Sequence, residues 1–327
     1  MFEMQRPLGT GFTAASTTAD VLEGIDLTGK HAIVTGGHAG LGLETTRALS
    51  TAGATVTIGA RDPERAAAAV AGLDRVEIGR LDLLDPASVD AFAERFLTTG
   101  RPLDILVNNA GIGSDKLELD ARGYEKVFAT NHLGHFQLTL ALLPALPGAR
   151  VVTLTSGGHR LSDIRWDDLH FATGFDAGAS YGQAKTANIL FTVELERRCA
   201  ATGLHAYAVH PGIAVATTLA RGADGMFPPE ALKAMGLIDD EGEPIIDPDT
   251  ERKTPEQAAS TVVFAATSPL LDGIGGVYLK NNDISPVDAT PFDGAIGTAP
   301  LTDVAPHALD PDSARRLWEL SERLIGA

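Results

Sequence analysis

Tyr181 and Lys185 have the residue types and the spacing that proton transfer requires. Four residues apart, their side chains share one face of a helix. A free phenol has a pKa of about 10 and exchanges protons poorly at neutral pH. An ammonium roughly 6 Å away, at an effective dielectric near 20, would favour the phenolate by about 3 kcal/mol and lower its pKa by about two. The pair therefore predicts a general acid–base, although this spacing alone is common by chance.

Two further polar residues could act beside that pair. Ser156 follows the predicted strand Arg150–Thr155, and its hydroxyl could hold a carbonyl oxygen next to the phenol. Asn131 lies inside a predicted helix, where asparagine is mildly unfavourable, which indicates a water-holding or backbone-bridging role. A plain polar contact of the helix is the alternative for Asn131. The candidate catalytic residues are therefore Asn131, Ser156, Tyr181 and Lys185.

A glycine-rich segment, GGHAGLG, follows the first predicted strand, His31–Thr35, and precedes an amphipathic helical run. Its glycines Gly36, Gly40 and Gly42 permit a tight turn and a close approach of backbone to a pyrophosphate. The helix N-terminus behind the turn offers unpaired amides and a positive dipole end. The segment predicts a dinucleotide-binding turn, and a tight turn without a ligand is the alternative.

The end of the second predicted strand bears on which dinucleotide is used. An acidic residue there would accept hydrogen bonds from the ribose of NAD, but the chain has Ala60 followed by Arg61. A guanidinium suits a 2′-phosphate, so we expect NADP(H) to be favoured over NAD(H). Stacking of Arg61 on adenine, or pairing with Asp62, is the alternative.

The third and fourth predicted strands also end in candidate cofactor contacts. Asp82, which precedes Leu83, could accept a hydrogen bond from the adenine amino group, unless it only caps a turn. The small residues of Asn108–Gly111 would let the cofactor pass, and their amides could bridge neighbouring strands. A purely structural turn is the alternative for that segment.

Strand-like runs alternate with helix-like runs from Lys30 onward. The predicted strands are His31–Thr35, Thr55–Gly59, Arg75–Gly79, Leu103–Val107, Arg150–Thr155, Leu204–Val209 and Gly276–Leu279. The predicted helices are Leu41–Ala52, Pro63–Ala71, Pro86–Thr98, Arg122–Leu146, Tyr181–Ala201 and Pro255–Ala266. This alternation predicts an α/β fold, a Rossmann-type doubly wound sheet of seven parallel strands with helices on both faces.

A single catalytic domain is expected over residues 30–280, with an N-terminal extension at 1–29 packed on it and a C-terminal extension at 281–327 that ends in a helix. Two long segments, 157–180 and 213–253, interrupt the alternation after strand ends and are expected to form the substrate pocket. Their large apolar side chains favour an apolar substrate, unless they are simply buried beneath the loops. These are Phe171, Phe175, Met226, Phe227 and Met235.

Composition excludes several classes of protein. The net charge of −17 opposes general binding to nucleic acids and to anionic lipids. The only cysteine, Cys199, excludes an intrachain disulfide and a zinc site with two thiolates, and no metal site is predicted. The first 30 residues do not form a secretory signal, and no apolar run makes a good membrane span. We therefore expect a cytoplasmic protein without stable membrane insertion.

Taken in order along the chain, these motifs resemble the short-chain dehydrogenase/reductase superfamily, from about Asp26 to Lys280. The segments ATNHLGHFQLT, VVTLTSGGHR and SYGQAKTANILFTVELERR resemble its retinol-dehydrogenase-like branch, which includes the WW-domain-containing oxidoreductases. The resemblance implies that Tyr181 exchanges the proton, Lys185 lowers its pKa and holds the nicotinamide ribose, and Ser156 orients the substrate oxygen. It also implies that Asn131 holds a water in a proton relay.

The same resemblance implies a cofactor-binding set. Gly36, His38, Gly40, Leu41 and Gly42 would surround the pyrophosphate, Asp82 and Leu83 the adenine, Asn108, Ala110 and Gly111 the ribose, and Pro211 and Gly212 the nicotinamide. The chain departs from the family where Ala216 replaces the usual threonine and Thr217 follows one residue later. Helices around Asn131 and Tyr181 form dimer faces in many relatives, so a homo-oligomer is possible.

The function expected from these residues is hydride transfer between NADP(H) and an alcohol/carbonyl pair on an apolar small molecule, with Tyr181 as general acid–base. One alternative keeps the fold but reduces a carbon–carbon double bond. Another is a dinucleotide-binding sensor without catalysis, although a sensor would not need Asn131, Ser156, Tyr181 and Lys185 together.

Overall fold

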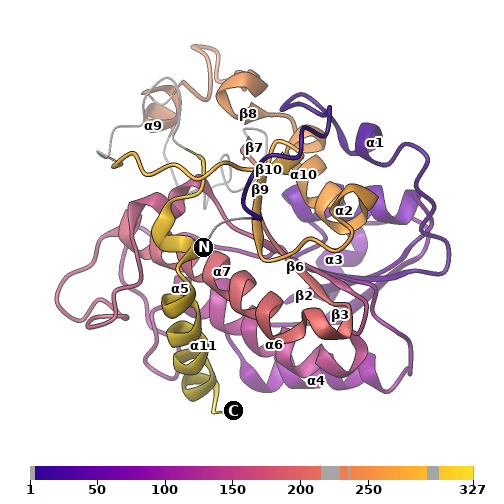
Figure 1. Cartoon of the computed structure of the whole chain (residues 1–327), viewed down its shortest axis with the longest axis horizontal. Coiled ribbons are helices and arrows are strands. Elements are labelled where there is room, and N and C mark those ends of the chain that lie inside the picture. The colour runs from indigo at the N-terminus through magenta and orange to yellow at the C-terminus, as the bar shows by residue number, and fades with distance from the viewer. Residues whose placement is uncertain (1–3, 215–228, 235, 293–301, 327) are drawn as a thin grey trace.

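A twisted central sheet carries helices on both faces (Figure 1) in the computed structural model, which describes residues 4–214, 229–234, 236–292 and 302–326. The strand order is β10-β9-β6-β5-β4-β1-β2-β3. The strands are β1 (His31–Thr35), β2 (Thr55–Ala60), β3 (Val76–Arg80), β4 (Ile105–Asn108), β5 (Arg150–Leu154), β6 (His205–His210), β9 (Val277–Lys280) and β10 (Asp283–Ile284). The order reverses next to β1, so the doubly wound α/β fold predicted from the sequence is confirmed.

The seven predicted strands pair in parallel, and β10 is an additional antiparallel strand beside β9. Asn281 and Asn282 join the two in a two-residue hairpin, and both have positive φ angles, 50° and 62°. Asparagine tolerates this left-handed backbone, which type I′ hairpin turns require. The asparagine pair was therefore the available sequence signal for β10.

The helices are α1 (Thr18–Val21), α2 (Gly40–Thr51), α3 (Pro63–Ala69), α4 (Pro86–Leu97), α5 (Lys126–Phe128), α6 (Gly134–Leu142), α7 (Ala177–Cys199), α9 (Pro229–Ala234), α10 (Pro255–Thr267) and α11 (Pro311–Ile325). The helices α2, α3, α4 and α10 begin within one residue of the predicted start, whereas α7 begins four residues earlier than predicted and α1 and α9 were not predicted. Three starts share one capping pattern, because Asp62, Asp85 and Thr254 each accept a hydrogen bond from a first-turn amide and precede a proline. The expected helix Arg122–Leu146 is instead interrupted between α5 and α6 by a π-helical turn, Ala129–Leu133.

Two apolar layers hold the sheet. One lies between the sheet and the helices α2 and α10, and it includes Val34, Leu49, Val107 and Val263. The other lies between the opposite face and the helices α4, α6 and α7. Because both faces are covered, β4 reads as a continuous apolar run, and all four of its residues are buried.

Both ends of the described chain pack on this framework. The Gln5 side chain donates to the carbonyl oxygens of Tyr278 and Ser285 at 2.8 and 2.7 Å. At the other end, α11 packs along α7, and Trp318 meets Phe136 edge-on with ring centroids 4.9 Å apart. Helix α11 therefore covers part of the helix face that the family resemblance connects with dimers.

Candidate active site

The glycine turn after β1 has the shape of an anion-binding cradle. Gly36 and Gly40 have positive φ angles of 65° and 51°, which favour glycine. A Cβ atom on Gly42 would lie 2.4 Å from the carbonyl oxygen of Gly36, so only glycine allows α2 to pack this closely on the turn. The N-cap residue of α2, Ala39, provides no side-chain hydrogen bond. The first-turn amides of α2 therefore remain available to phosphate oxygens.

Positive charge gathers beside this turn. Arg61 follows β2 directly, and Arg65 lies in the first turn of α3; among the described residues neither has an ion-pair partner. Asp62, the expected alternative partner of Arg61, caps α3 by accepting from the Arg65 amide at 3.0 Å. Burial and the charges of Arg65 and Arg61 lower the pKa of His38, while Asp62 raises it. Arg65 was not predicted; its position four residues after Arg61, at the start of a helix, was the available signal.

The turn after β3 places Asp82 and Leu83 against the π-helical region. One carboxylate oxygen of Asp82 accepts from the Leu84 amide at 3.1 Å. This oxygen therefore caps the turn, as the alternative interpretation of Asp82 predicted. Leu83 is buried, and a Cβ atom on Gly134 would lie 2.4 Å from its carbonyl oxygen. Gly134 therefore lets α6 approach this turn closely.

The turn after β4 is tied to β1 through one threonine. The hydroxyl oxygen of Thr35 accepts from the amides of Asn109 and Ala110, both at 2.9 Å. The Asn108 Nδ2 donates to the Thr139 hydroxyl at 3.1 Å, which connects the end of β4 with α6. A Cβ atom on Gly36 would meet the Ala110 Cβ at 3.3 Å. The glycine turn and the turn after β4 thus lie in contact.

Asn131 lies in the π-helical turn and bridges backbone. Its Oδ1 accepts from the Ile112 amide at 2.8 Å, and its Nδ2 donates to the Ile112 carbonyl oxygen at 2.9 Å. This is the backbone-bridging role foreseen for a helical asparagine. A Cβ atom on Gly111 would lie 3.5 Å from the Asn131 Oδ1 and 3.7 Å from the Lys185 Nζ. Gly111, Asn131 and Lys185 therefore converge, and π-helical turns are often found at such sites.

His135, which was not predicted, joins this network one turn further along the helix. Its Nδ1 donates to the Asn131 carbonyl oxygen at 3.0 Å, and its Nε2 accepts from the Thr35 hydroxyl at 2.9 Å. Burial lowers the pKa of His135 to about 4, so the ring is neutral. The histidine four residues after Asn131 was the available sequence signal.

Ser156, Tyr181 and Lys185 meet beyond the carboxyl end of β5. The Ser156 hydroxyl accepts from the Gly158 amide at 3.1 Å and hydrogen-bonds with Tyr181. The Lys185 ammonium lies 5.4 Å from the centre of the Tyr181 ring and donates to the Leu154 carbonyl oxygen at 3.2 Å. Helix α7 begins at the Asp176 cap, which places Tyr181 and Lys185 on successive turns. The structure thus brings the three residues together.

The electrostatics of this trio differ from the expectation. The sequence argument predicted that Lys185 would lower the pKa of the Tyr181 phenol, but burial raises that pKa, and the hydrogen bond with Ser156 lowers it only in part. Burial also lowers the pKa of Lys185 to about 8. The expectation was wrong because it counted the attraction between the charges and omitted the loss of water around the phenol.

Pro211 and Gly212 follow β6, at the edge where the other site residues gather. Gly212 has a φ of 81°, and a Cβ atom on it would lie 2.9 Å from the Lys253 Cδ. The amide of Ile213 donates to the Glu251 carbonyl oxygen at 2.7 Å. The short strands β7 (Ile213–Ala214) and β8 (Arg252–Lys253) then pair in parallel. The segment after Gly212 is therefore held against Glu251 and Lys253, two buried charged residues that were not predicted.

The expected substrate loops are described only in part. Phe171 is buried, packs edge-on against Phe175 and lies under the Arg165 guanidinium, so burial is the better account of this side chain. Leu232, Leu237 and Ile238 form a small apolar cluster with Ile213. Five positions singled out in the sequence lie outside the described residues. These are Ala216, Thr217, Met226, Phe227 and Met235.

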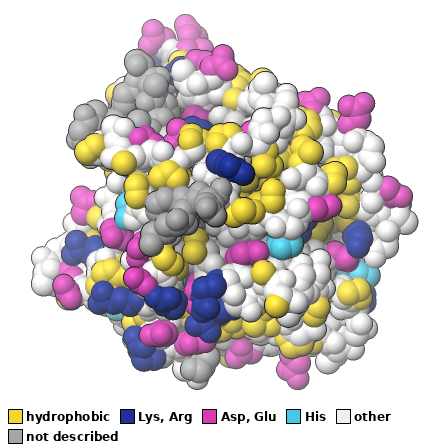
Figure 2. All heavy atoms as spheres, in the orientation of Figure 1, with side chains coloured by type: hydrophobic (Ala, Val, Ile, Leu, Met, Phe, Trp, Pro, Cys, Tyr) yellow, Lys and Arg dark blue, Asp and Glu magenta, His cyan; other side chains and the backbone are white. Residues whose placement is uncertain are grey.

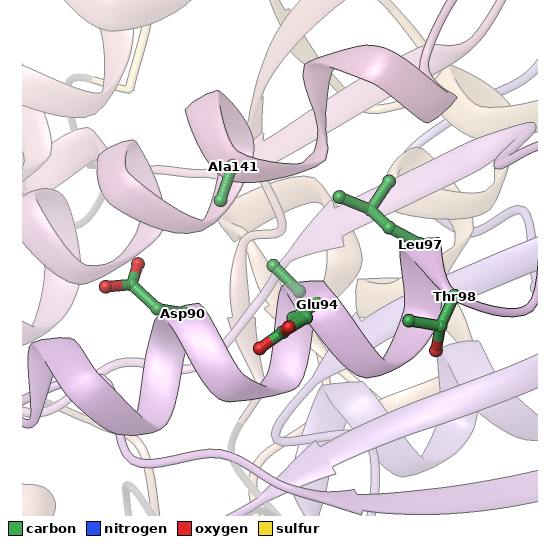
Figure 3. A pocket seen from close by; sticks show the side chains of 6 residues that line it. Asp90, Glu94, Leu97, Thr98 and Ala141 are labelled. Atoms are coloured by element: carbon green, nitrogen blue, oxygen red, sulfur yellow. The ribbon is translucent and has the colours of Figure 1, made fainter.

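A hollow of about 390 Å³ lies between α4 and α6, away from this edge (Figure 3). It is lined by Asp90, Ala93, Glu94, Leu97, Thr98 and Ala141. None of these residues belongs to the predicted site. Within the described parts of the chain, no helix has both the length and the apolar character needed to cross a bilayer.

Comparisons with known proteins agree with this geometry. The family profile described as short chain dehydrogenase matches residues 30–224. A protein of Streptomyces lividans named "Probable oxidoreductase" is 45% identical over 93% of this chain and 100% of its own length. Retinol dehydrogenase 12 of Bos taurus is 35% identical over 92% of this chain and 88% of its own. The solved Pseudomonas aeruginosa RhlG/NADP active-site complex has a TM-score of 0.59 and 26% identity, covering 78% of this chain and 95% of that one.

Proposed function

The chain belongs to the short-chain dehydrogenase/reductase family, on its retinol-dehydrogenase-like branch, and we propose that it interconverts an alcohol with its carbonyl using NADP(H). The observation that carries this proposal is the meeting of Ser156, Tyr181 and Lys185 beside Gly111 and Asn131. All five lie beyond the carboxyl ends of parallel strands, where doubly wound sheets bind their ligands. The oxidoreductase chemistry agrees with the family.

The described residues fit a dinucleotide. A side chain on Gly36 or Gly42 would fill the space of the glycine turn. Helix α2 begins at this turn, and Ala39 provides its first-turn amides with no side-chain cap. The buried Nδ1 of His38 has no partner in the described chain. Gly36, His38, Gly40, Leu41 and Gly42 would hold the pyrophosphate, Asp82 and Leu83 the adenine, Asn108, Ala110 and Gly111 the ribose, and Pro211 and Gly212 the nicotinamide. When bound, such a cofactor gives or accepts a hydride.

The chain's own residues would manage the proton and the substrate oxygen. In the reduction direction, Tyr181 donates its phenolic proton to the carbonyl oxygen, and Ser156 donates a hydrogen bond to the same atom. The raised pKa keeps the phenol protonated at neutral pH. The Lys185 ammonium has hydrogens beyond the one given to Leu154, and these would hold the ribose and return a proton to Tyr181. Asn131 fixes the turn after β4 beside Lys185.

Preference for NADP(H) is supported by the absence of an acid at the last position of β2 and by the guanidiniums of Arg61 and Arg65, which form no ion pair with any residue that the structure describes. The solved relative with bound NADP is in line with it. An apolar substrate is supported by the apolar cluster that Leu232, Leu237 and Ile238 form with Ile213 in the second expected substrate segment. Hydrophobic side chains also show at several places on the face seen in Figure 2. The proposed substrate class is therefore an apolar alcohol, aldehyde or ketone.

Replacement of Tyr181 by phenylalanine tests the proposal. General acid–base groups contribute on the order of 10²- to 10⁴-fold, so Tyr181→Phe should lose about that much turnover with apolar aldehydes and ketones, while NADPH affinity stays unchanged. Absorbance of the reduced nicotinamide reports turnover, and fluorescence titration reports binding. Tyr124→Phe is the matched control, since the Tyr124 hydroxyl donates to the Leu324 carbonyl oxygen outside the site. Retained turnover in Tyr181→Phe would refute the mechanism, and reduction confined to carbon–carbon double bonds would favour the alternative reaction.

A further inference from the structure

Two histidine side chains hydrogen-bond to the peptide group between Ser156 and Gly157. Its carbonyl oxygen accepts from the His159 Nδ1 at 2.7 Å. Its amide donates to the His210 Nδ1 at 3.2 Å. His159 and His210 are both buried, and they come from different parts of the fold: His159 from the turn after β5 and His210 from the last position of β6. The His159 amide also donates to the Ser156 carbonyl oxygen, at 3.0 Å, so this peptide group is held by its own turn and by the end of β6.

These contacts demand opposite neutral forms of the two rings. His159 donates through Nδ1, and its Nε2 accepts from the Ala305 amide at 3.0 Å, so only Nδ1 carries a proton. His210 accepts at Nδ1, so its proton lies on Nε2. Burial lowers the pKa of His159 to about 3 and that of His210 to about 4, which keeps both rings neutral. A second proton on the His159 ring would face the Ala305 amide, and one on the His210 ring would face the Gly157 amide. Each ring would then present a donor to a group that is itself a donor.

A buried carboxylate faces the protonated nitrogen of His210. The Glu251 Oε2 lies 3.8 Å from the His210 Nε2, and neither atom has a hydrogen-bond partner in the described chain. Burial opposes the charge of Glu251, but His210, Lys253, Lys280 and Asn281 together keep its pKa below its usual range. The Glu251 Oε1 accepts from Asn281 and from Thr302, each at 3.2 Å. Glu251 is thus held as an anion that favours a proton on the nearer nitrogen of His210.

The local sequence explains why such restraint is needed. Ser156 is followed by Gly157 and Gly158, which have no side chains to limit their backbone rotation. The Ser156 hydroxyl depends on that backbone, because it accepts from the Gly158 amide at 3.1 Å. A Cβ atom on Gly158 would lie 3.0 Å from a ring carbon of Tyr181, so the segment must remain small there. Besides the backbone hydrogen bond of this turn, the side chains of His159 and His210 restrain the segment.

We propose that His159 and His210 are positioning residues that orient the Ser156 hydroxyl through the Ser156–Gly157 peptide group, and that Glu251 holds His210 in the required tautomer. This inference rests on the proposed function of Ser156. It also gives the C-terminal extension a part in the site, since Ala305 anchors His159 and Thr302 anchors Glu251.

Kinetics of His210 variants test the proposal. Asparagine places an acceptor close to the position of Nδ1, whereas leucine has none. His210→Leu should lower kcat for carbonyl reduction by about tenfold, as expected for one lost hydrogen bond, with NADPH affinity and the carbonyl KM little changed; His210→Asn should restore most of the loss. In the Ser156→Ala background the leucine substitution should have almost no further effect. A full additional loss in that background would show that His210 does not act through Ser156.

A second measurement does not depend on turnover. ¹⁵N NMR of histidine-labelled protein distinguishes the tautomers, with His159→Asn and His210→Asn used to assign the signals. We expect the Nδ1-protonated form for His159 and the Nε2-protonated form for His210, both persisting to about pH 5. The opposite tautomer, or protonation of either ring near pH 6.5, overturns the inference whether or not the enzyme is active. Glu251→Gln should shift the His210 signal without unfolding the protein. Turnover by the unmodified protein and by Tyr181→Phe judges the proposed function separately.

Discussion

Removal of the two surface arginines beside the glycine turn should change the cofactor preference. Arg61 and Arg65 both influence the pKa of His38, and neither is paired within the described chain, so their loss breaks no internal ion pair. A hydrogen bond to a charged group contributes about 1.5–3 kcal/mol, or about 10- to 150-fold in affinity. Because both side chains are exposed, solvent screening favours the lower end of that range, about tenfold for each.

The assay is a fluorescence titration with NADPH and NADH at fixed ionic strength. Arg61→Ala and Arg65→Ala should each weaken NADPH binding about tenfold and leave NADH binding unchanged, and the double variant should lose about a hundredfold if the two act independently. Arg101→Ala is the control, because its guanidinium pairs with Glu77 at 2.8 Å, away from the glycine turn. An unchanged ratio of the two affinities would refute the assignment of these arginines to a 2′-phosphate. Equal losses for both cofactors would assign them to a part that NADPH and NADH share.

Four other predictions follow from the described contacts. Gly42→Ala should abolish NADPH binding in the same titration while circular dichroism stays native, because its Cβ would lie 2.4 Å from the Gly36 carbonyl oxygen; retained affinity would contradict the cradle. Since burial raises the pKa of Tyr181, the reduction rate should be nearly flat from about pH 6 to about pH 7 and should fall above about pH 8, where Lys185 loses the proton that it returns to the phenol; oxidation, which needs the phenolate, should rise with pH. The pKa of Lys185 is about 8, below its ordinary 10.5, so the unfolded chain binds more protons between these values. The free energy of unfolding should therefore rise with pH more steeply in the unmodified protein than in Lys185→Met, as urea titrations at several pH values would show. Trp318→Ala should cost about 3–5 kcal/mol of stability, because the ring is buried against Phe136 and α7, and a change below about 1 kcal/mol in urea unfolding would contradict that packing.

Much of the site could be predicted because its elements carry local signals. Aspartate or threonine before proline marks the starts of α3, α4 and α10, and each of these residues forms a capping hydrogen bond. The glycines of the first turn are required by backbone angles and close contacts at those same positions. The alternation of short apolar runs and helical runs predicted a doubly wound parallel sheet, because covered parallel strands and right-handed crossovers allow few other arrangements.

The remaining features depend on contacts between residues far apart in the chain. Nothing in the local pattern around His210 places Glu251 beside it, since the two meet only after β7 and β8 pair. Likewise, the direction of the Tyr181 pKa could not be read from its spacing to Lys185. The spacing supplies the attraction between the two groups, but the degree to which the fold removes water from the phenol decides the sign. Thus the sequence alone determined the doubly wound parallel sheet, the glycine turn and the pairing of Tyr181 with Lys185. Only the tertiary structure decided which buried groups surround Ser156 and how they are charged, because burial is a property of the packed molecule.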